Sequence, residues 1–262
     1  MDLAALLAPL SGALVGLVLG LIGGGGSILA VPLLVYVVGV TPTHVALGTS
    51  ALAVALTALV NLIPHARAGR VKWQCALVFT VSGMIGAWAG SSVAKVVDGQ
   101  QLLVLFGLLM LVIGGTMLFG RAGGGNAEIR LSSATASRLL PRLIPIGFGV
   151  GVLSGFFSIG GGFLIVPGLM LATGMPLAFA GATSLVAVFA FGATTATNYA
   201  ISGLVDWQLA ALFILGGAIG GGIGVFVGRW MSGHKNALRY VFSAVVISVG
   251  IWIVWRGLGA LM

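Results

Sequence analysis

Two runs of consecutive glycines are candidates for a binding site, because of their residue type and their spacing. The first is Gly23-Gly24-Gly25-Gly26, followed by Ser27, and the second is Gly160-Gly161-Gly162. Consecutive glycines break a helix, whereas glycines at four-residue intervals only thin one of its faces and let another helix pack closely. We predict this packing role for Gly12, Gly16 and Gly20, for Gly147, Gly151 and Gly155, and for Gly216, Gly220, Gly224 and Gly228. A helix that restarts after a break presents unpaired N–H groups and the positive end of its dipole, which suits an anion. We therefore predict anion contacts at Gly24, Gly25, Gly26, Ser27, Gly160, Gly161 and Gly162.

Hydroxyl and amide side chains supply a second set of candidate anion ligands. Thr49-Ser50 and Thr183-Ser184 occupy equivalent places early in the apolar segment that follows each glycine run, and Asn61 and Asn198 lie farther along those segments. Within a membrane, Ser and Thr most often bond to their own helix or a neighbouring one, whereas an unpaired amide is costly to bury. We predict that Thr49, Ser50, Asn61, Thr183, Ser184 and Asn198 line the anion pathway, with helix packing as the alternative role.

The composition determines the solvent in which these residues work. Of 262 residues, 59% are hydrophobic and 6% are charged, whereas soluble domains carry about 25% charged residues. Repeated apolar runs of roughly 18 to 24 residues are long enough to cross a bilayer as helices. The sequence therefore predicts an all-α polytopic membrane protein.

Other classes of function find little support. No Asp or Glu falls within a predicted span, and no Ser-His-acid arrangement or metal-ligand spacing occurs, so we predict neither an enzyme nor a bound cofactor or metal. No Gly-Lys-Ser/Thr follows the glycine runs, which argues against a nucleotide site. The net charge of +8 is spread over connecting segments, which fits the positive-inside rule better than nucleic-acid binding.

The chain is an internal duplication. A shift of about 135 residues pairs the glycine runs, and it pairs Val31-Pro32 with Val166-Pro167. A shift of about 134 then pairs Gly69-Arg70-Val71-Lys72-Trp73-Gln74 with Gly203-Leu204-Val205-Asp206-Trp207-Gln208. We predict a first membrane repeat at 1–120, a cytoplasmic linker at 121–142 and a second membrane repeat at 143–262.

Each repeat is expected to contain a glycine-broken helical hairpin and three continuous spans. The broken segments cover about 4–39 and 143–174, and each splits into arms of roughly 13 to 18 residues, which suits a re-entrant hairpin better than one crossing of a ~30 Å core. The continuous spans are expected near 44–64, 75–97, 101–119, 179–201, 208–228 and 238–256.

Loop charges indicate how the repeats are oriented. The loop after the first continuous span carries Arg67, Arg70 and Lys72, but its counterpart in the second repeat has only Asp206. The next loop reverses this contrast, because the charges of Lys95 and Asp98 cancel in the first repeat, whereas the second repeat has Arg229, Lys235 and Arg239. Since lysine and arginine collect on the cytoplasmic side, the sequence predicts inverted-topology repeats. The alternative is eight conventional spans in parallel repeats.

The glycine runs and their surroundings resemble the TauE/SafE family. The resemblance is carried by Gly23-Gly24-Gly25-Gly26-Ser27-Ile28-Leu29-Ala30-Val31-Pro32, by His44-Val45-Ala46-Leu47-Gly48-Thr49-Ser50, and by their echo at Ser158 to Pro167 and Ala182-Thr183-Ser184. It covers nearly the whole chain. It implies a permease of the bacterial inner membrane that moves sulfite or small organosulfonates.

Together these features predict a secondary transporter or facilitator of small sulfur-containing anions. Access would alternate around a mid-membrane site formed by two half-helix N-termini. An anion channel of the same architecture and a non-transporting membrane assembly subunit remain the alternatives. The expected partners are a small anionic substrate and membrane lipid, with no nucleic acid, and the sequence leaves a homo-oligomer open.

Overall fold

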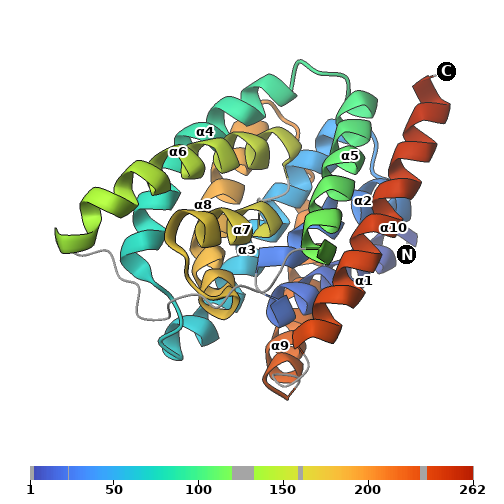
Figure 1. Ribbon diagram of the computed structural model, residues 1–262. Coiled ribbons are helices and arrows are strands. Elements are labelled where there is room, and N and C mark those ends of the chain that lie inside the picture. The colour runs from blue at the N-terminus through green and yellow to red at the C-terminus, as the bar shows by residue number, and fades with distance from the viewer. Residues whose placement is uncertain (1–2, 23, 120–132, 159–161, 231–234, 262) are drawn as a thin grey trace.

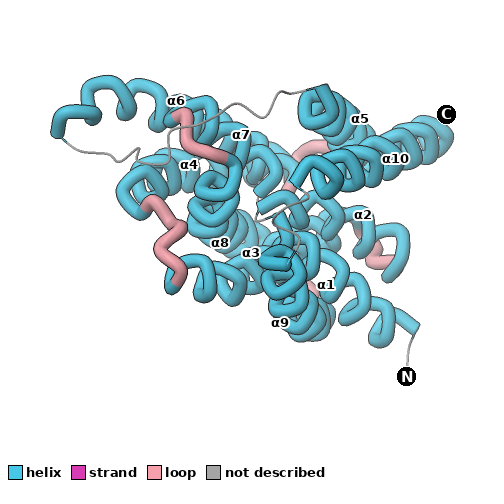
Figure 2. Tube along the Cα trace, turned by 60° about the horizontal axis from the view of Figure 1, so that its bottom comes forward, coloured by secondary structure: helices cyan, strands magenta, loops and turns pink. Residues whose placement is uncertain are grey.

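The computed structural model is a bundle of helices without strands in the part of the chain that it describes (Figures 1 and 2). The described residues are 3–22, 24–119, 133–158, 162–230 and 235–261. The first half comprises α1 (Leu3–Ile22), η1 (Gly24–Leu29), α2 (Ala30–Pro32), η2 (Leu33–Val38), α3 (Thr43–Arg67), α4 (Trp73–Ala94) and α5 (Gly99–Phe119). The second comprises α6 (Ser133–Phe157), α7 (Gly162–Thr173), α8 (Leu177–Ile201), α9 (Trp207–Trp230) and α10 (Lys235–Leu261).

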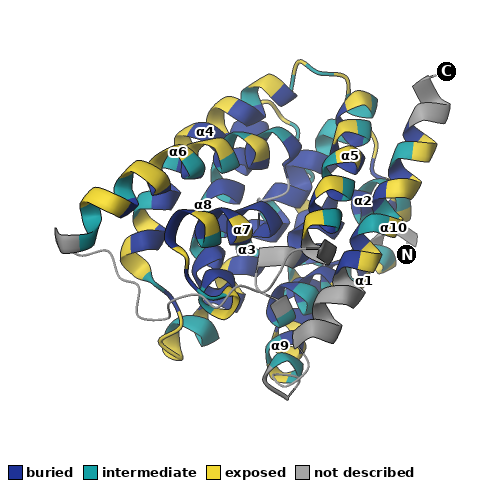
Figure 3. Cartoon of the chain, in the orientation of Figure 1, coloured by how far each residue is buried: buried dark blue, intermediate teal, exposed yellow. Residues whose placement is uncertain are grey.

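Six of these helices are long and apolar enough to cross a membrane: α3, α4, α5, α6, α8 and α9. Large apolar side chains lie exposed on these helices, and the yellow bands in Figure 3 mark exposed positions along them. Examples are Val81, Ile85, Val112, Leu215, Ile219 and Phe226. A soluble protein seldom exposes so much contiguous apolar surface, so these faces suit contact with lipid. The predicted all-helical class is confirmed for the described residues, and five of the six predicted continuous spans are among these helices. The sixth, predicted at 238–256, lies in the helix α10, whose described apolar part Ser243–Gly257 is shorter, whereas α6, predicted as a hairpin arm, is long enough to cross.

Both glycine-broken segments form hairpins in which a short second arm folds back on the first. The chain reverses after α1, and a Cβ atom placed on Gly26 of η1 would lie 2.5 Å from the backbone nitrogen of Leu19. In the second hairpin, Gly168 of α7 packs against Val150 of α6. The second arm of the first hairpin changes type from 3₁₀ to α to π geometry between Gly24 and Val38.

The predicted arm lengths are wrong for the first arm of each hairpin. The helix α1 has 20 residues and α6 has 25, whereas α7 has 12. The first arms are longer because their glycine-bearing faces pack along a partner helix over many turns. The helix α6 begins at Ser133, within the range 121–142 predicted as linker, while residues 120–132 lie outside the described part of the chain.

The first helix of each half packs against the fourth helix of the other half. These pairs, α1 with α9 and α6 with α4, make the most extensive helix–helix contacts in the described structure. Glycines form both seams: the backbone of Gly16 lies against that of Gly217, and Gly151 lies against Gly83. A Cβ atom at Gly16 or Gly151 would overlap the facing backbone carbonyl, and one at Gly217 or Gly83 would overlap the side chain of Thr57 or Phe191. The predicted packing role of the four-residue glycine spacing is thereby confirmed.

Two further pairs join equivalent helices of the two halves. In the α3–α8 pair, Gly48 meets Tyr199 and Leu204, whereas Ala51 and Ala55 meet Gly192. Residue numbers rise along α3 while those of the contacting residues on α8 fall, so the two helices are antiparallel. The helices α5 and α10 lie side by side in Figures 1 and 2 and are antiparallel in the same way.

Equivalent turns end equivalent helices. Gly69 after α3 and Gly203 after α8 have φ of +66° and +71°, a conformation that glycine adopts at little cost. The N–H of Arg70 donates to the carbonyl of His65 at 3.2 Å, and the N–H of Leu204 donates to that of Tyr199 at 3.0 Å. This is the Schellman arrangement in both halves.

We predict that Gly220→Ala lowers the melting temperature of the purified protein. The added methyl group would overlap the backbone carbonyl of Ala13, and overpacking of this kind costs about 1–3 kcal/mol. The control is Gly222→Ala on the same helix, where a Cβ atom meets nothing within 4 Å. It should keep or raise the melting temperature, since alanine favours a helix by about 1 kcal/mol. Equal melting temperatures for the two variants would contradict the close α1–α9 seam.

Candidate functional site

The second arms of the two hairpins meet in the buried centre of the bundle. The start of α7 contacts η1, and Gly26, Ser27 and Gly162 are buried. Gly24 and Gly25 form the first turn of η1. The predicted ligands Gly160 and Gly161 lie outside the described residues. The structure therefore brings together the described parts of both predicted helix starts.

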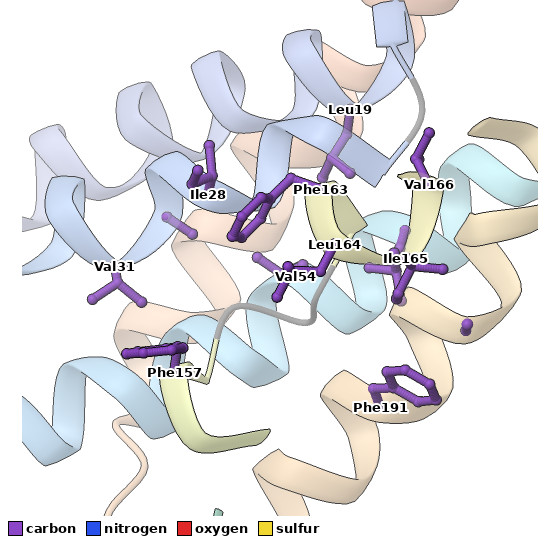
Figure 4. Close-up of a cluster of buried hydrophobic side chains, with 14 of the residues drawn as sticks. Leu19, Ile28, Val31, Val54, Phe157, Phe163, Leu164, Ile165, Val166 and Phe191 are labelled. Atoms are coloured by element: carbon purple, nitrogen blue, oxygen red, sulfur yellow. The ribbon is translucent and has the colours of Figure 1, made fainter. Parts of the chain in front are cut away.

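Apolar side chains surround this meeting point. Figure 4 shows Ile28 of η1 and Phe163 and Leu164 of α7 within one cluster, together with Val54 of α3. Ile28 and Val54 have no exposed surface, and Phe163 is 3% exposed. Any polar contact with a ligand at this level must come from the backbone and from the few hydroxyl groups nearby. A low-dielectric wall also strengthens the interaction between a charge and a backbone dipole.

Thr49 and Thr183 make mirrored hydrogen bonds across the two halves. The Thr49 hydroxyl oxygen accepts from the N–H of Asp206 at 2.9 Å, and the Thr183 hydroxyl oxygen accepts from the N–H of Lys72 at 3.1 Å. Asp206 and Lys72 stand directly before α9 and α4. Each threonine therefore satisfies a backbone donor at the start of a helix from the other half. The sequence register had paired these threonines but gave no sign of these partners.

Ser50 and Ser184 bond first to their own helices. The Ser50 hydroxyl donates to the carbonyl of Leu47 at 2.8 Å, and the Ser184 hydroxyl donates to that of Gly181 at 2.7 Å. Ser50 also lies 3.2 Å from the carbonyl oxygen of Ser158, at the end of α6. Ser158 has φ of +53°, which is unusual for a residue with a side chain. Ser50 thus ties α3 to the break of the second hairpin.

Asn61 lies on the seam between α3 and α9. Its side-chain nitrogen donates to the carbonyl of Thr57 at 3.0 Å, and its amide group would overlap any side chain at Gly221. Asn61 is 2% exposed. It is away from the two helix starts and nearer the end of α3.

Asn198 belongs to a polar cluster with Lys95, which sequence reasoning had dismissed as a loop charge. The Lys95 ammonium donates to the Asn198 side-chain oxygen at 2.7 Å and to the Ser202 hydroxyl at 2.9 Å. The Asn198 amide donates in turn to Ser91 at 2.6 Å and Ser92 at 2.9 Å. The cluster joins the ends of α4 and α8. A signal was present in the sequence, because Lys95 and the two serines share one end of a predicted span.

The described side chains contain no group of three His, Cys, Asp or Glu residues placed to hold a metal ion. The geometry of the buried centre offers backbone dipoles, hydroxyl groups and apolar walls. This set of groups can bind and pass an anion, and it contains no arrangement for general acid–base or nucleophilic chemistry.

A family model described as sulfite exporter TauE/SafE matches residues 8–253. The chain belongs to the TauE/SafE family. It is 50% identical over 252 residues to a probable membrane transporter protein of Xylella fastidiosa strain 9a5c, covering 96% of this chain and 95% of that protein. It is 30% identical over 264 residues to the probable membrane transporter protein YunE of Bacillus subtilis, covering 94% and 96% of the two chains. No solved structure matches this TauE/SafE protein.

These relatives confirm the predicted family. With the six apolar helices, they establish a multi-pass membrane protein of a transporter family. The antiparallel helix pairs and the two buried hairpins are thus features of a TauE/SafE protein.

We predict that Thr49→Val and Thr183→Val each destabilise this TauE/SafE protein. Valine keeps the shape of threonine but leaves the N–H of Asp206 or Lys72 without its acceptor, which costs about 1–3 kcal/mol. Thermal unfolding of the purified variants measures the loss. The controls are Thr49→Ser and Thr183→Ser, which keep the hydroxyl. Valine variants as stable as the serine variants would show that the mirrored bonds contribute little.

Proposed function

We propose that this protein is a secondary transporter or facilitator of small sulfur-containing anions, sulfite or organosulfonates, in the bacterial inner membrane. The observation that carries the proposal is the contact between η1 and α7 in the buried centre, where two glycine-broken hairpins begin their second arms. Backbone N–H groups at such helix starts favour an anion without needing a charged side chain. The family description supports sulfite as the first substrate to test.

The proposed binding site keeps the residues expected from the sequence. In the first half it comprises Gly24, Gly25, Gly26 and Ser27, and in the second half Gly160, Gly161 and Gly162. The bonds of Thr49, Thr183 and Ser50 to elements of the other half suit residues that hold this site in place. Ser184 and the two asparagines would contribute along the path rather than at its centre.

The helix pairing supports inverted repeats. The equivalent helices α3 and α8 run antiparallel, and so do α5 and α10. A two-fold axis that exchanges antiparallel partners lies across the helices. If the helices cross the bilayer along its normal, that axis lies in the membrane plane, and the two halves have opposite topology. Re-entrant hairpins, each entering from its own side, complete this arrangement and allow access to alternate between the two sides.

The topology can be tested by labelling equivalent cysteines. Ala68 and Ser202 are exposed residues that cap the equivalent helices α3 and α8. After replacement of the native Cys75 by Ala, we expect Ala68→Cys to react from the cytoplasm and Ser202→Cys to react from outside. An impermeant thiol reagent applied to intact cells and to inverted vesicles distinguishes the two sides. Reaction of both cysteines from one side would contradict inverted repeats.

The transport activity can be tested in proteoliposomes. We expect uptake of sulfite or a small sulfonate to saturate with concentration and to show counterflow, because a carrier exchanges one substrate for another. Gly25→Ala should reduce transport at least about tenfold, since the methyl group opposes the helix break and this loss needs only ~1.4 kcal/mol.

The control for this test is Gly222→Ala, which faces open space on α9 and should transport normally. Flux that neither saturates nor shows counterflow would favour the anion channel. Absence of both binding and flux for every sulfur anion tried would favour the assembly subunit. Normal transport by Gly25→Ala would show that the helix starts are not part of the binding site.

A further inference from the structure

A small cavity opens between the ends of α1, α3 and α9, away from the buried centre. Its volume is about 60 Å³, and its lining residues are Gly20, Leu21, Pro64, His65, Ala68, Arg70, Val225 and Gly228. On the same measure a cavity needs only about 10–15 Å³ to hold one water molecule. The space is therefore large enough for a group of several atoms.

Two of the lining residues carry basic side chains, and none of them is acidic. The turn at Gly69 brings Arg70 back over the end of α3, where its N–H donates to the carbonyl of His65. A guanidinium group is always charged, and its planar set of donors matches the oxygens of an oxyanion. Of the two glycines in the wall, Gly20 packs against the backbone of α9, whereas a Cβ atom on Gly228 would meet only Leu21, at 3.5 Å or beyond.

The cavity adjoins a residue that the sequence had placed on the anion pathway. Asn61 precedes His65 by four residues on α3, and Gly221 precedes Val225 by four residues on α9. Residues four apart share one face of a helix, and Asn61 lies against Gly221. Asn61 is therefore one helical turn deeper than the cavity, along the same seam.

The equivalent place in the second half holds a hydrogen-bonded cluster. By the shift of 134 residues, Pro64 and Ala68 correspond to Asn198 and Ser202, which are bridged there by the ammonium group of Lys95. Arg70 corresponds to Leu204, which carries no charge. The two ends of the molecule thus differ: one has a cavity lined by His65 and Arg70, whereas at the other the ammonium group of Lys95 donates hydrogen bonds to Asn198 and Ser202.

We propose that the cavity binds the anionic group of the transported substrate before it enters the protein, with Arg70 as its principal ligand and His65 beside it. This inference rests on the proposed function for the substrate class. A lipid phosphate offers similar chemistry, but the small cavity between three helix ends suits a free oxyanion such as sulfite.

Two pairs of matched variants test the cavity. Arg70→Gln removes the guanidinium group, and its control Arg67→Gln removes the same charge from a residue that is exposed, as Arg70 is, but does not line the cavity. Gly228→Val fills the cavity; a Cβ atom there makes only ordinary contacts, the nearest at 3.5 Å. Its control is Gly222→Val, where a Cβ atom meets nothing within 4 Å.

The measurements are calorimetric binding of sulfite to the full-length protein in nanodiscs of zwitterionic lipid and sulfite uptake by proteoliposomes. We expect Arg70→Gln and Gly228→Val to raise the dissociation constant and the half-saturating concentration roughly tenfold, as loss of a charge-assisted bond predicts. Both controls should stay within about twofold of the unmodified protein. A melting temperature for each variant verifies that it is folded.

Each remaining outcome has a distinct meaning. If all four variants bind and transport like the unmodified protein, the cavity is not an anion site, while the proposed function stands. If sulfite binding depends on Arg70 but no sulfur anion is transported, the cavity is supported and the proposed function fails. Failure of both binding and transport in the unmodified protein overturns both. Loss of sulfite binding when anionic lipid is added to the nanodiscs would assign the cavity to lipid phosphate.

Discussion

Close backbone contact between glycine-bearing helices is the constraint on which the rest of this structure depends. An apolar side chain gains little free energy when it moves from lipid into the protein interior, because both are apolar. Helices in a membrane therefore associate through van der Waals contact at short range. Gly16 against Gly217 and Gly151 against Gly83 provide that contact twice. Because each seam joins the first helix of one half to the fourth helix of the other, the two halves are interlocked.

The interlocked frame leaves the short arms of the hairpins in the centre. The backbone of the first short arm is not regular, since η1, α2 and η2 differ in helix type, whereas the described part of the second is the α-helix α7. Such a backbone is tolerated at membrane depth only when it is buried in protein or lines a cavity. The α3–α8 pair flanks the hairpins. Thr49 on α3 and Thr183 on α8 accept hydrogen bonds from residues before α9 and α4, and Ser50 on α3 bonds to Ser158 at the break of the second hairpin. The frame thus positions helix starts that could not persist in contact with lipid.

Much of this fold could be predicted from periodicity and spacing. Hydrophobic length located the continuous spans to within a few residues, and the four-residue glycine pattern identified the packing faces. The lengths of α1 and α6 could not be predicted, because they depend on partners about 70 or 200 residues distant that one-dimensional patterns do not pair. The alignment of the two repeats paired Thr49 with Thr183, but it could not show that each threonine bonds to a residue of the other half.

The candidate site was predicted less completely. Lys95 and Arg70 were interpreted only as loop charges, because their roles arise from where helix ends converge. Asn198 was expected on a pathway, and its binding to Lys95 and Ser91 depends on the parallel packing of α4 with α8. Chemistry that resides in a single segment was visible in the sequence, whereas chemistry shared between segments required the fold.

The exchange of helices between the halves also has a consequence for biosynthesis. The glycine face of α1 finds its partner only on α9, about 200 residues later in the chain, whereas α4 meets α6 after about 65 residues. Contacts so distant in sequence form late. As the nascent chain enters the membrane, α1 must therefore wait, with its backbone seam facing lipid or a helper protein, while the α4–α6 seam already closes. The insertion of α9 closes this seam, and α10 can only then pack beside α5.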